Sequence, residues 1–428
     1  MKVKYGNLTK NIKYVVSKIN CGNEVTILLR VNVGSRDEPD SMKGISHLLE
    51  HMFFRGTEKY PTQKDLTVEL YKCGGDFNAY TEKDSTVFHI TVSKKCIEKG
   101  IEILSESYYN SLFRDEDLKK EKKIVINEIN DNLSEPSTLM LYGLDELVFQ
   151  KTRLEKDIAG TVETVSSLNI FNLKNFINTY YVKDVVVSVS GNIDLNKTIS
   201  LVKKYFNKNV YYDVKKDNIL IKDKKRILYY DYYKKKSVFR DKYIKKNVEQ
   251  SYIGIGFSSY EYKDDKRYIM SIISELLTGY LGSKLYERLR GKNGLVYGVS
   301  IGTEKYIDIS QITVTCSTEN KKENILKCIV IILEELNALK YDTITDEEFN
   351  DSISNIIENI KNGKNDHEYL ADKFAEDLIY KGKPVLLDEY IQKYNSFTKE
   401  DIIVVAKELF TKDKCKICYT GKDRIILK

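Results

Sequence analysis

Several residue types are scarce in this chain of 428 residues, which contains no tryptophan, four prolines and only four histidines. Long apolar runs are also missing: no stretch approaches the roughly 20 apolar residues that cross a bilayer. The first residues lack the basic region, apolar stretch and small-residue cleavage site that together mark a signal peptide. We therefore expect a cytoplasmic protein with no membrane partner.

Cysteine is present, but its pattern does not predict a disulfide framework. The seven cysteines are odd in number and scattered along a chain without a secretion signal. Cys415 and Cys418 form the one CxxC motif, in a segment that reads as a terminal β-strand over residues 414–420. Residues three apart on a strand point to opposite faces. The pair is therefore a poor candidate for a zinc or redox site.

The order of the predicted elements indicates an α+β protein made of two homologous halves. From about residue 247, a pattern of strands and helices seen near the N-terminus starts again. A repeat of about 210 residues predicts an internal duplication, in which each copy is a mainly antiparallel sheet packed with helices. In the first copy we expect strands at 24–33, 76–93 and 185–190 and helices at 45–54, 63–72 and 115–133.

The duplication predicts three segments: an N-terminal half at 1–215, a linker at 216–246 and a C-terminal half at 247–428. The linker is rich in lysine and tyrosine, and such side chains can follow phosphates and stack on bases. Nucleic-acid binding is therefore one interpretation of this linker. We favour a solvated linker or hairpin and expect no nucleic-acid partner, because no known binding motif surrounds it and the net charge of the whole chain is only +6.

Half of the histidines lie in one predicted helical turn. His47 and His51 are four residues apart in the sequence HLLEH, and such a pair on a helix directs two ring nitrogens to one point. Neutral imidazole is the commonest protein ligand for zinc. Glu50, on nearly the same face, can take a proton from water, so the pattern is typical of HxxEH hydrolases. The alternative is a pair of core histidines on an apolar helix.

A catalytic zinc ion commonly takes three protein ligands and keeps a fourth position for water. Beyond the histidine pair, the candidates for a third ligand are His89, His367 or a carboxylate. Glu121 and Glu128 are seven residues apart in a predicted helix, so both carboxylates emerge on one stripe. This spacing alone does not select the ligand, because glutamates are common on exposed helix faces.

A longer motif surrounds the histidine pair: residues 34–39 read GSRDEP and residues 44–57 read GISHLLEHMFFRGT. This segment resembles the active site of the pitrilysin and mitochondrial processing peptidase family of zinc metallopeptidases. The resemblance implies that Glu128 is the third zinc ligand and that Glu121 is a supporting glutamate. For Glu121, an exposed helix position is the alternative.

Two further segments extend the resemblance. Residues 74–81 read GGDFNAYT, similar to the family's strand beside bound peptide. Residues 289–297 read LRGKNGLVY, with glycine and valine where the family usually has an acidic residue and alanine. The family's arginine and tyrosine, which contact substrate, fall on Arg290 and Tyr297. The alternative for Arg290 is a surface position on a helix, and the alternative for Tyr297 is an aromatic side chain packed in the core. The implied peptide-binding residues are Phe77, Asn78, Ala79, Tyr80, Arg290 and Tyr297.

The resemblance implies a zinc-dependent endopeptidase of the short, bacterial single-chain type, with one Zn²⁺ per chain. The implied substrates are unfolded or short peptides, such as leader or presequence-like segments, cleaved in a closed chamber. The chain is expected to pair as a homodimer or as a heterodimer with a related chain. A catalytically silent partner subunit is the alternative, and a nucleic-acid-binding protein is a less favoured one. The implied catalytic residues are Glu50, Glu121, Arg290 and Tyr297.

Overall fold

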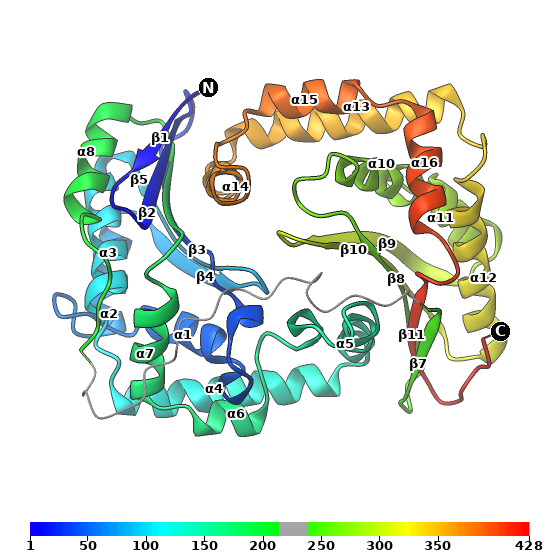
Figure 1. Cartoon of the computed structure of the whole chain (residues 1–428), viewed down its shortest axis with the longest axis horizontal. Helices are drawn as coiled ribbons and strands as arrows, with labels where there is room; N and C mark the ends of the chain where they lie inside the picture. The colour runs from blue at the N-terminus through cyan, green and yellow to red at the C-terminus, as the bar shows by residue number, and fades with distance from the viewer. Residues whose placement is uncertain (214–237, 428) are drawn as a thin grey trace. The chain divides into compact units, whose positions relative to one another are not determined.

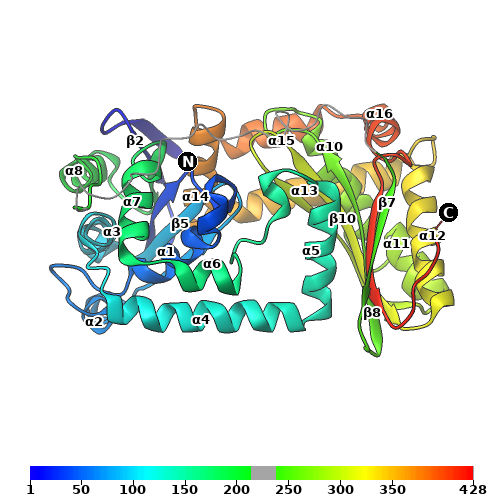
Figure 2. The same cartoon turned by 60° about the horizontal axis from the view of Figure 1, so that its bottom comes forward.

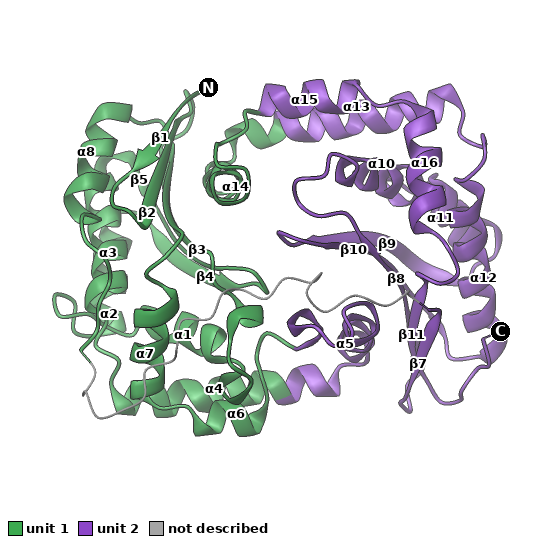
Figure 3. Ribbon diagram, in the orientation of Figure 1, with its two compact units in different colours: residues 1–129, 157–226, 362–386 green, residues 130–156, 227–361, 387–428 purple. Residues whose placement is uncertain are grey.

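The computed structural model describes residues 1–213 and 238–427, which divide into two compact units (Figures 1 and 3). Each unit combines one β-sheet with packed helices, which confirms the predicted α+β class. The units take their described residues from the following ranges: 1–129, 157–226 and 362–386 for unit 1, and 130–156, 227–361 and 387–428 for unit 2.

Unit 1 contains a six-stranded sheet of order β1-β2-β6-β3-β5-β4. Strands β2 and β6 pair in parallel, and the other neighbours pair antiparallel. Strand β4 lies at one edge, so its outer side has no described partner strand. The strands are β1 (Lys2–Asn7), β2 (Ile12–Lys18), β3 (Glu24–Val31), β4 (Asp76–Thr81), β5 (Thr86–Ser93) and β6 (Val185–Gly191).

Helices α1 and α3 pack against strands of this sheet, and together they enclose a core that includes Phe53, Phe88 and Leu104. Phe53 and Phe88 stack with ring centroids 4.1 Å apart, which ties α1 to β5. The helices of unit 1 are α1 (Ile45–Phe53), α2 (Gln63–Lys72), α3 (Ile97–Asn110), most of α4 (Asp115–Ser134), α6 (Val162–Ser167), α7 (Ile170–Tyr180), α8 (Leu195–Tyr205) and α14 (His367–Tyr380).

Unit 2 contains a five-stranded sheet of order β7-β11-β8-β10-β9, in which β7 and β11 pair in parallel and the others antiparallel. Its strands are β7 (Arg240–Lys245), β8 (Gln250–Ser259), β9 (Val296–Lys305), β10 (Ser310–Glu319) and β11 (Lys416–Gly421). Its helices are α5 (Pro136–Val148), α10 (Arg267–Thr278), α11 (Lys284–Tyr286), α12 (Lys322–Ala338), α13 (Asp346–Asn362), α15 (Leu387–Asn395) and α16 (Lys399–Leu409).

The two sheets share one topology, which confirms the predicted duplication. If β1 is set aside, the order β2-β6-β3-β5-β4 corresponds strand for strand to β7-β11-β8-β10-β9. The parallel pair also falls at the same place in both sheets. Two sheets with the same order and the same pairing directions are what a duplicated sequence produces.

Each compact unit receives one helix from the other half of the sequence (Figure 3). Helix α14, encoded late in the chain, packs on β2, β3 and β6 of unit 1. Helix α5, encoded early, packs on the equivalent strands β7, β8 and β11 of unit 2. The compact units therefore differ from a simple division of the chain into the predicted segments 1–215 and 247–428.

The predicted linker at 216–246 lies outside the described residues as far as residue 237. The last part of the predicted linker is a strand instead, because Arg240–Lys245 form β7. This strand is at a sheet edge and carries charged residues that hide the alternation of a strand. Helix α5 was also not predicted, because Gly143 weakens its helical pattern. A Cβ at residue 143 would lie 2.6 Å from the Cys418 sulfur, so glycine at this position permits close packing of α5 on β11.

One pair of cysteines differs from the expectation that the chain forms no disulfide framework. Cys73 at the end of α2 and Cys96 just before α3 form a disulfide, with their Cα atoms 5.7 Å apart. The pairing of β4 with β5 brings the two residues together, since Asp76 lies opposite Thr91 and the Ser93 N–H donates to the Cys73 carbonyl. Cys415 and Cys418 are free and buried, and burial raises the pKa of each thiol to about 12. Every helix within residues 1–213 and 238–427 is too short or too polar to cross a membrane.

The position of α14 generates a stability prediction. Phe374 is fully buried on this helix, so Phe374→Ala should cost about 3–5 kcal/mol. Hydrogen exchange should quicken in β2, β3 and β6 of unit 1, although residue 374 is encoded in the second half. Tyr369→Ala, on the same helix but 40% exposed, is the matched control and should cost less. Faster exchange confined to unit 2 would contradict the assignment of α14.

Candidate functional site

The histidine helix α1 begins at a tightly specified turn. Gly44 precedes it with φ +87°, and a Cβ there would lie 2.3 Å from the carbonyl oxygen of Ala159. The buried Glu38 carboxylate accepts hydrogen bonds from the backbone N–H groups of Gly44 and Ser46, at 2.9 and 2.8 Å. Burial raises the pKa of Glu38 to about 7 against the effect of these bonds. This cap fixes where the helix starts and therefore where its histidines lie.

Side-chain contacts between helix α1 and helix α4, both labelled in Figures 1 and 2, bring the three predicted ligands together. The rings of His47 and His51 are nearly perpendicular, with centroids 4.8 Å apart. From α4, the Oε2 atom of Glu128 lies 3.7 Å from Nε2 of His47 and 3.6 Å from Nε2 of His51. Two atoms that bind one tetrahedral zinc ion at about 2.0–2.2 Å lie about 3.3–3.6 Å apart. The two nitrogen–oxygen distances are therefore close to those around a zinc ion.

Glu50 lies close enough to compete for the same ion. Its ligand atoms and those of the two histidines lie within 4.8 Å of one another. The Oε2 atom of Glu50, however, already accepts a 2.6 Å hydrogen bond from the Thr81 hydroxyl. Glu128 is 42% exposed, and both of its ion-pair contacts in the described structure are with the histidines. Both carboxylates therefore lie within reach of an ion held by the two histidines.

The other two histidines do not join this cluster. His89 lies on β5, where its Nε2 is 3.6 Å from Oε1 of Glu368. His367 is the first residue of α14. Of the alternatives that the sequence left open for a third ligand, the carboxylate is the one that the described structure places beside both histidines.

Glu121 lies on α4, seven residues before Glu128. Its side chain is fully buried, which excludes the exposed helix position that was the alternative. Its Oε2 atom is 3.1 Å from Nδ1 of His51, and its Oε1 atom forms an ion pair with Arg55. In the neutral ring, a hydrogen bond from Nδ1–H of His51 to this carboxylate leaves Nε2 unprotonated, and this nitrogen lies 3.6 Å from Oε2 of Glu128. Arg55 balances the charge of the buried carboxylate, and the sequence did not single it out.

The charges around the two histidines differ. Burial, together with the nearby His51, lowers the pKa of His47 to about 4, so its ring is neutral near pH 7. Burial also acts to lower the pKa of His51, but the hydrogen bond to Glu121 and the negative charges of Glu128 and Glu50 outweigh it and raise that pKa. Burial raises the pKa of Glu50, partly opposed by the Thr81 hydrogen bond.

Thr81 is a contact that the sequence did not reveal, although it lies in the family-like GGDFNAYT segment. It is the last residue of β4, and the turn that follows is anchored on several sides. Arg30 is buried and donates to Glu82 and to Asp372 of α14, each at 2.7 Å. Arg36 pairs with Asp84 at 2.9 Å. Glu82, Arg30, Arg36 and their partners therefore fix the end of β4 and the position of the Thr81 hydroxyl.

The predicted peptide-binding residues of β4 divide between its two faces. Phe77 and Ala79 are packed against the core, and the Phe77 ring lies 4.3 Å from that of Phe54. Asn78 is exposed, and Tyr80 lies on the same face as Asn78. The side chains of Phe77 and Ala79 therefore hold the strand in place, and among the described residues the outer backbone edge of β4 has no partner strand.

Arg290 and Tyr297 belong to unit 2 and are described within it. Arg290 lies in a π-helical turn at Glu287–Lys292, and Tyr297 lies on the edge strand β9. The guanidinium carbon of Arg290 is 4.9 Å from the centre of the Tyr297 ring, which is a cation–π distance. Tyr297 is 83% exposed, which excludes the reading of this residue as a core aromatic.

Two family models match the chain in sequence. The model described as insulinase (peptidase family M16) matches residues 14–162, and the model described as peptidase M16 inactive domain matches residues 167–356. The chain belongs to the M16 peptidase family, as the HLLEH segment and its neighbours predicted. The first match contains both histidines and Glu128, and the second covers the half that lacks a histidine pair.

Individual relatives agree with this assignment. The chain is 28% identical over 414 residues to the uncharacterized zinc protease YmxG of Bacillus subtilis, covering 93% of this chain and 97% of that protein. It is 29% identical over 184 residues to a probable mitochondrial-processing peptidase subunit beta of Arabidopsis thaliana, covering 43% and 34%. The crystal structure of a protease from Helicobacter pylori shares the fold, with a TM-score of 0.87, 21% identity and coverage of 98% and 99%. The names of the relatives indicate a zinc protease.

The contact between Glu121 and His51 predicts a change in titration. In protein freed of metal by a chelator, Glu121→Gln should lower the pKa of His51, because the substitution removes a charge and weakens the hydrogen bond to the carboxylate. NMR titration of the imidazole C–H signals measures this shift, and the signals of His89 and His367 are internal controls. Because folding raises this pKa above 6.5, the stabilisation from the pair is complete at lower pH and is lost as pH rises through the folded value. An unchanged His51 titration would contradict the contact.

Proposed function

We propose that this protein is a zinc-dependent endopeptidase whose metal is held by His47, His51 and Glu128. The observation that carries the proposal is the approach of one Glu128 oxygen to within 3.7 Å of both histidine Nε2 atoms. The neutral state of His47 supports it, because a protonated imidazole cannot bind a metal. Zinc bound there would act as a Lewis acid and make a water molecule acidic enough to lose its proton near neutral pH.

Glu50 is the proposed general base. It lies on α1 between the two ligands, and burial raises its pKa toward the range in which a carboxylate both accepts and releases a proton. Thr81 would hold the Oε2 atom, so that the other carboxylate oxygen is left to take a proton from water and return it to the leaving amine. Glu121 would act through His51, by fixing the tautomer and orientation of that ring.

Peptide substrates are proposed to add as a strand to β4, at the edge of the described sheet. Backbone groups of Phe77, Asn78, Ala79 and Tyr80 would pair with an extended peptide, and this mode selects unfolded or short substrates over folded ones. Leader or presequence-like peptides remain a prediction. Arg290 and Tyr297 remain predicted contacts for substrate, and their exposure in unit 2 supports that role.

The closed chamber, the pairing of the chain and its cytoplasmic location also remain predictions. The subunit named in the Arabidopsis relative supports a paired state, as a homodimer or with a related chain. The match of residues 167–356 to an inactive-domain model keeps the silent partner subunit as a second candidate. The two candidates differ in what they predict for zinc and for peptide cleavage by the isolated chain.

Substitutions at the centre separate metal binding from proton transfer. Glu50→Gln should retain zinc but lower kcat by about 100- to 10,000-fold, because it removes a general base. His51→Ala and Glu128→Gln should lose both zinc and activity. Metal analysis and a quenched-peptide assay, with and without chelator, measure these outcomes. Glu116→Gln, at an exposed position of α4, is the matched control.

Retained turnover in Glu50→Gln would exclude this glutamate as the base. A wild-type chain that binds stoichiometric zinc but cleaves no peptide would instead support a silent or partner subunit. A chain that neither binds zinc nor responds to chelator would reject the metal centre itself.

Thr81 offers a test of how the base is positioned. Thr81→Val removes the hydroxyl that donates to Glu50 and should lower kcat by about 10- to 100-fold, the range for loss of a positioning contact. KM and zinc content should stay unchanged, since neither substrate nor metal contacts this side chain in the proposed site. Thr81→Ser keeps the hydroxyl and should restore most of the rate. Equal rates in the valine and serine variants would show that the hydrogen bond does not matter.

A further inference from the structure

A pocket in unit 2, remote in sequence from the histidine helix, has a lining unlike that of the candidate metal site. It has a volume of about 420 Å³, within the range of small-molecule sites. Its floor includes Phe257 and Phe410, which are almost fully buried and whose ring centroids are 5.2 Å apart. Leu326, Val330 and Ile426 line it and are 42%, 43% and 80% exposed. The pocket therefore joins buried aromatic surface to apolar side chains that face solvent.

One wall of the pocket is a continuous stripe of helix α12. The lining residues along it recur at helical spacing from Leu326 to Asn337, so they share one face. At 1.5 Å per residue this stripe is about 17 Å long. That length is close to the extended length of dodecanoate, and a linear apolar chain fits such a stripe better than a compact ring system does.

The polar part of the lining is small and positively charged. It includes Lys340, which donates to Asn337 at 3.0 Å, and Lys412. No acidic residue is among those that line the pocket, and neither lysine forms an ion pair with any residue that the structure describes. Two cations without carboxylate partners beside an apolar wall complement a ligand with an apolar tail and an anionic head.

From these features we propose that unit 2 binds a single-chain amphiphile with a carboxylate head, of the fatty-acid class. The tail lies along the α12 stripe over Phe257 and Phe410, and the head lies where Lys340 and Lys412 can reach it. Lysine side chains suit this position because their apolar stems can line the pocket while the ammonium groups stay solvated. This binding is independent of the proposed peptidase chemistry.

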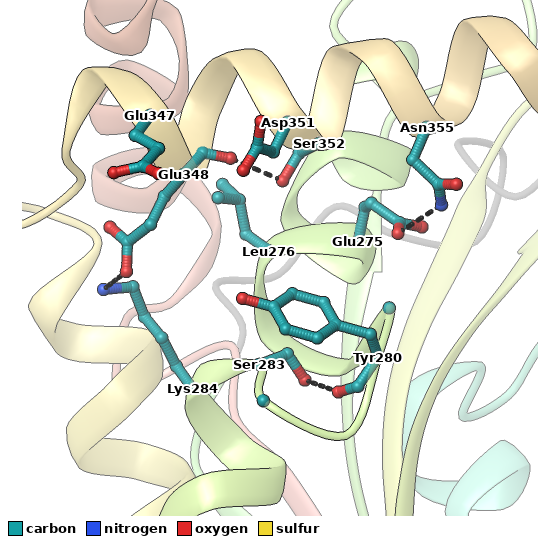
Figure 4. A pocket seen from close by; sticks show the side chains of 12 residues that line it. Glu275, Leu276, Tyr280, Ser283, Lys284, Glu347, Glu348, Asp351, Ser352 and Asn355 are labelled. Carbon is teal, nitrogen blue, oxygen red and sulfur yellow. Dashed lines mark hydrogen bonds and ion pairs between the residues drawn. The ribbon is translucent and has the colours of Figure 1, made fainter.

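A second pocket of unit 2 supplies the contrast that the experiment needs. It has a volume of about 510 Å³ and is lined by Glu275, Glu347, Glu348 and Asp351, with Lys284 paired to Glu348 (Figure 4). The negative charge of this lining repels a carboxylate head and attracts a cationic one. A cationic amphiphile with the same tail can therefore associate with unit 2 without entering the α12 pocket.

The test is calorimetric titration of the full chain with dodecanoate, kept below the concentration at which it forms micelles. We expect saturable binding of one molecule per chain, with decanoate binding roughly tenfold more weakly because it buries two fewer methylenes. Dodecyltrimethylammonium, with an equal tail and a positive head, should compete with labelled dodecanoate at least tenfold less effectively than unlabelled dodecanoate does. Displacement of bound dodecanoate by both heads with equal affinity, or no saturable binding of dodecanoate, would overturn the proposal.

Two variants locate the binding. Val330→Glu places a carboxylate on the apolar wall and should abolish dodecanoate binding, while Lys412→Glu should weaken it about tenfold. Val404→Glu, at a position of α16 that is 47% exposed and does not line the pocket, is the matched control and should bind normally. Circular dichroism melting confirms that each variant is folded. Unchanged dodecanoate binding by folded Val330→Glu overturns the proposal. The proposal is also overturned if the wild type binds no dodecanoate and Val330→Glu changes only the oligomeric state of the chain.

Discussion

The candidate site depends on one buried carboxylate. Glu121 is fully buried between His51 and Arg55, so it joins α4 to the helix that carries both histidines. Burial of a carboxylate is costly unless cationic groups and hydrogen bonds compensate for lost water. Arg55 and His51 provide that compensation, which fixes the rotation of α4 against α1. With this rotation fixed, Glu128, seven residues further along α4, faces both histidine Nε2 atoms.

A second constraint reaches the site from the other end of the chain. Helix α14 is encoded in the second half of the sequence but packs on the sheet of unit 1. Its Asp372 shares the buried Arg30 with Glu82, directly after Thr81. Thr81 in turn donates to Glu50. Glu50 is thus held by the end of β4, and α14 fixes the position of that strand end. The packing of α14 on unit 1 therefore affects the chemistry of the site as well as the stability of the unit.

Sequence patterns predicted the parts of the fold that are periodic and the parts of the site that are close in sequence. The helix at 63–72 and the helix at 45–54 appear as α2 and α1, the latter one residue shorter, because both carry clear periodicity and end signals. Strand β7 was missed because charges mask its alternation, and α5 because Gly143 interrupts its pattern. Arg55 and Thr81 were missed because isolated polar residues carry no signal until a partner is known.

By itself the sequence determined that an HxxEH pair lies on a helix, that the chain is duplicated, and that one half lacks a histidine pair, because spacing and repetition are local properties of the chain. Only the tertiary structure decided which of several carboxylates and histidines meet. It buried Glu121, placed a Glu128 oxygen beside both rings, set Thr81 against Glu50, and left β4 at a sheet edge. These are contacts between residues far apart in sequence, and packing, rather than spacing, selects them.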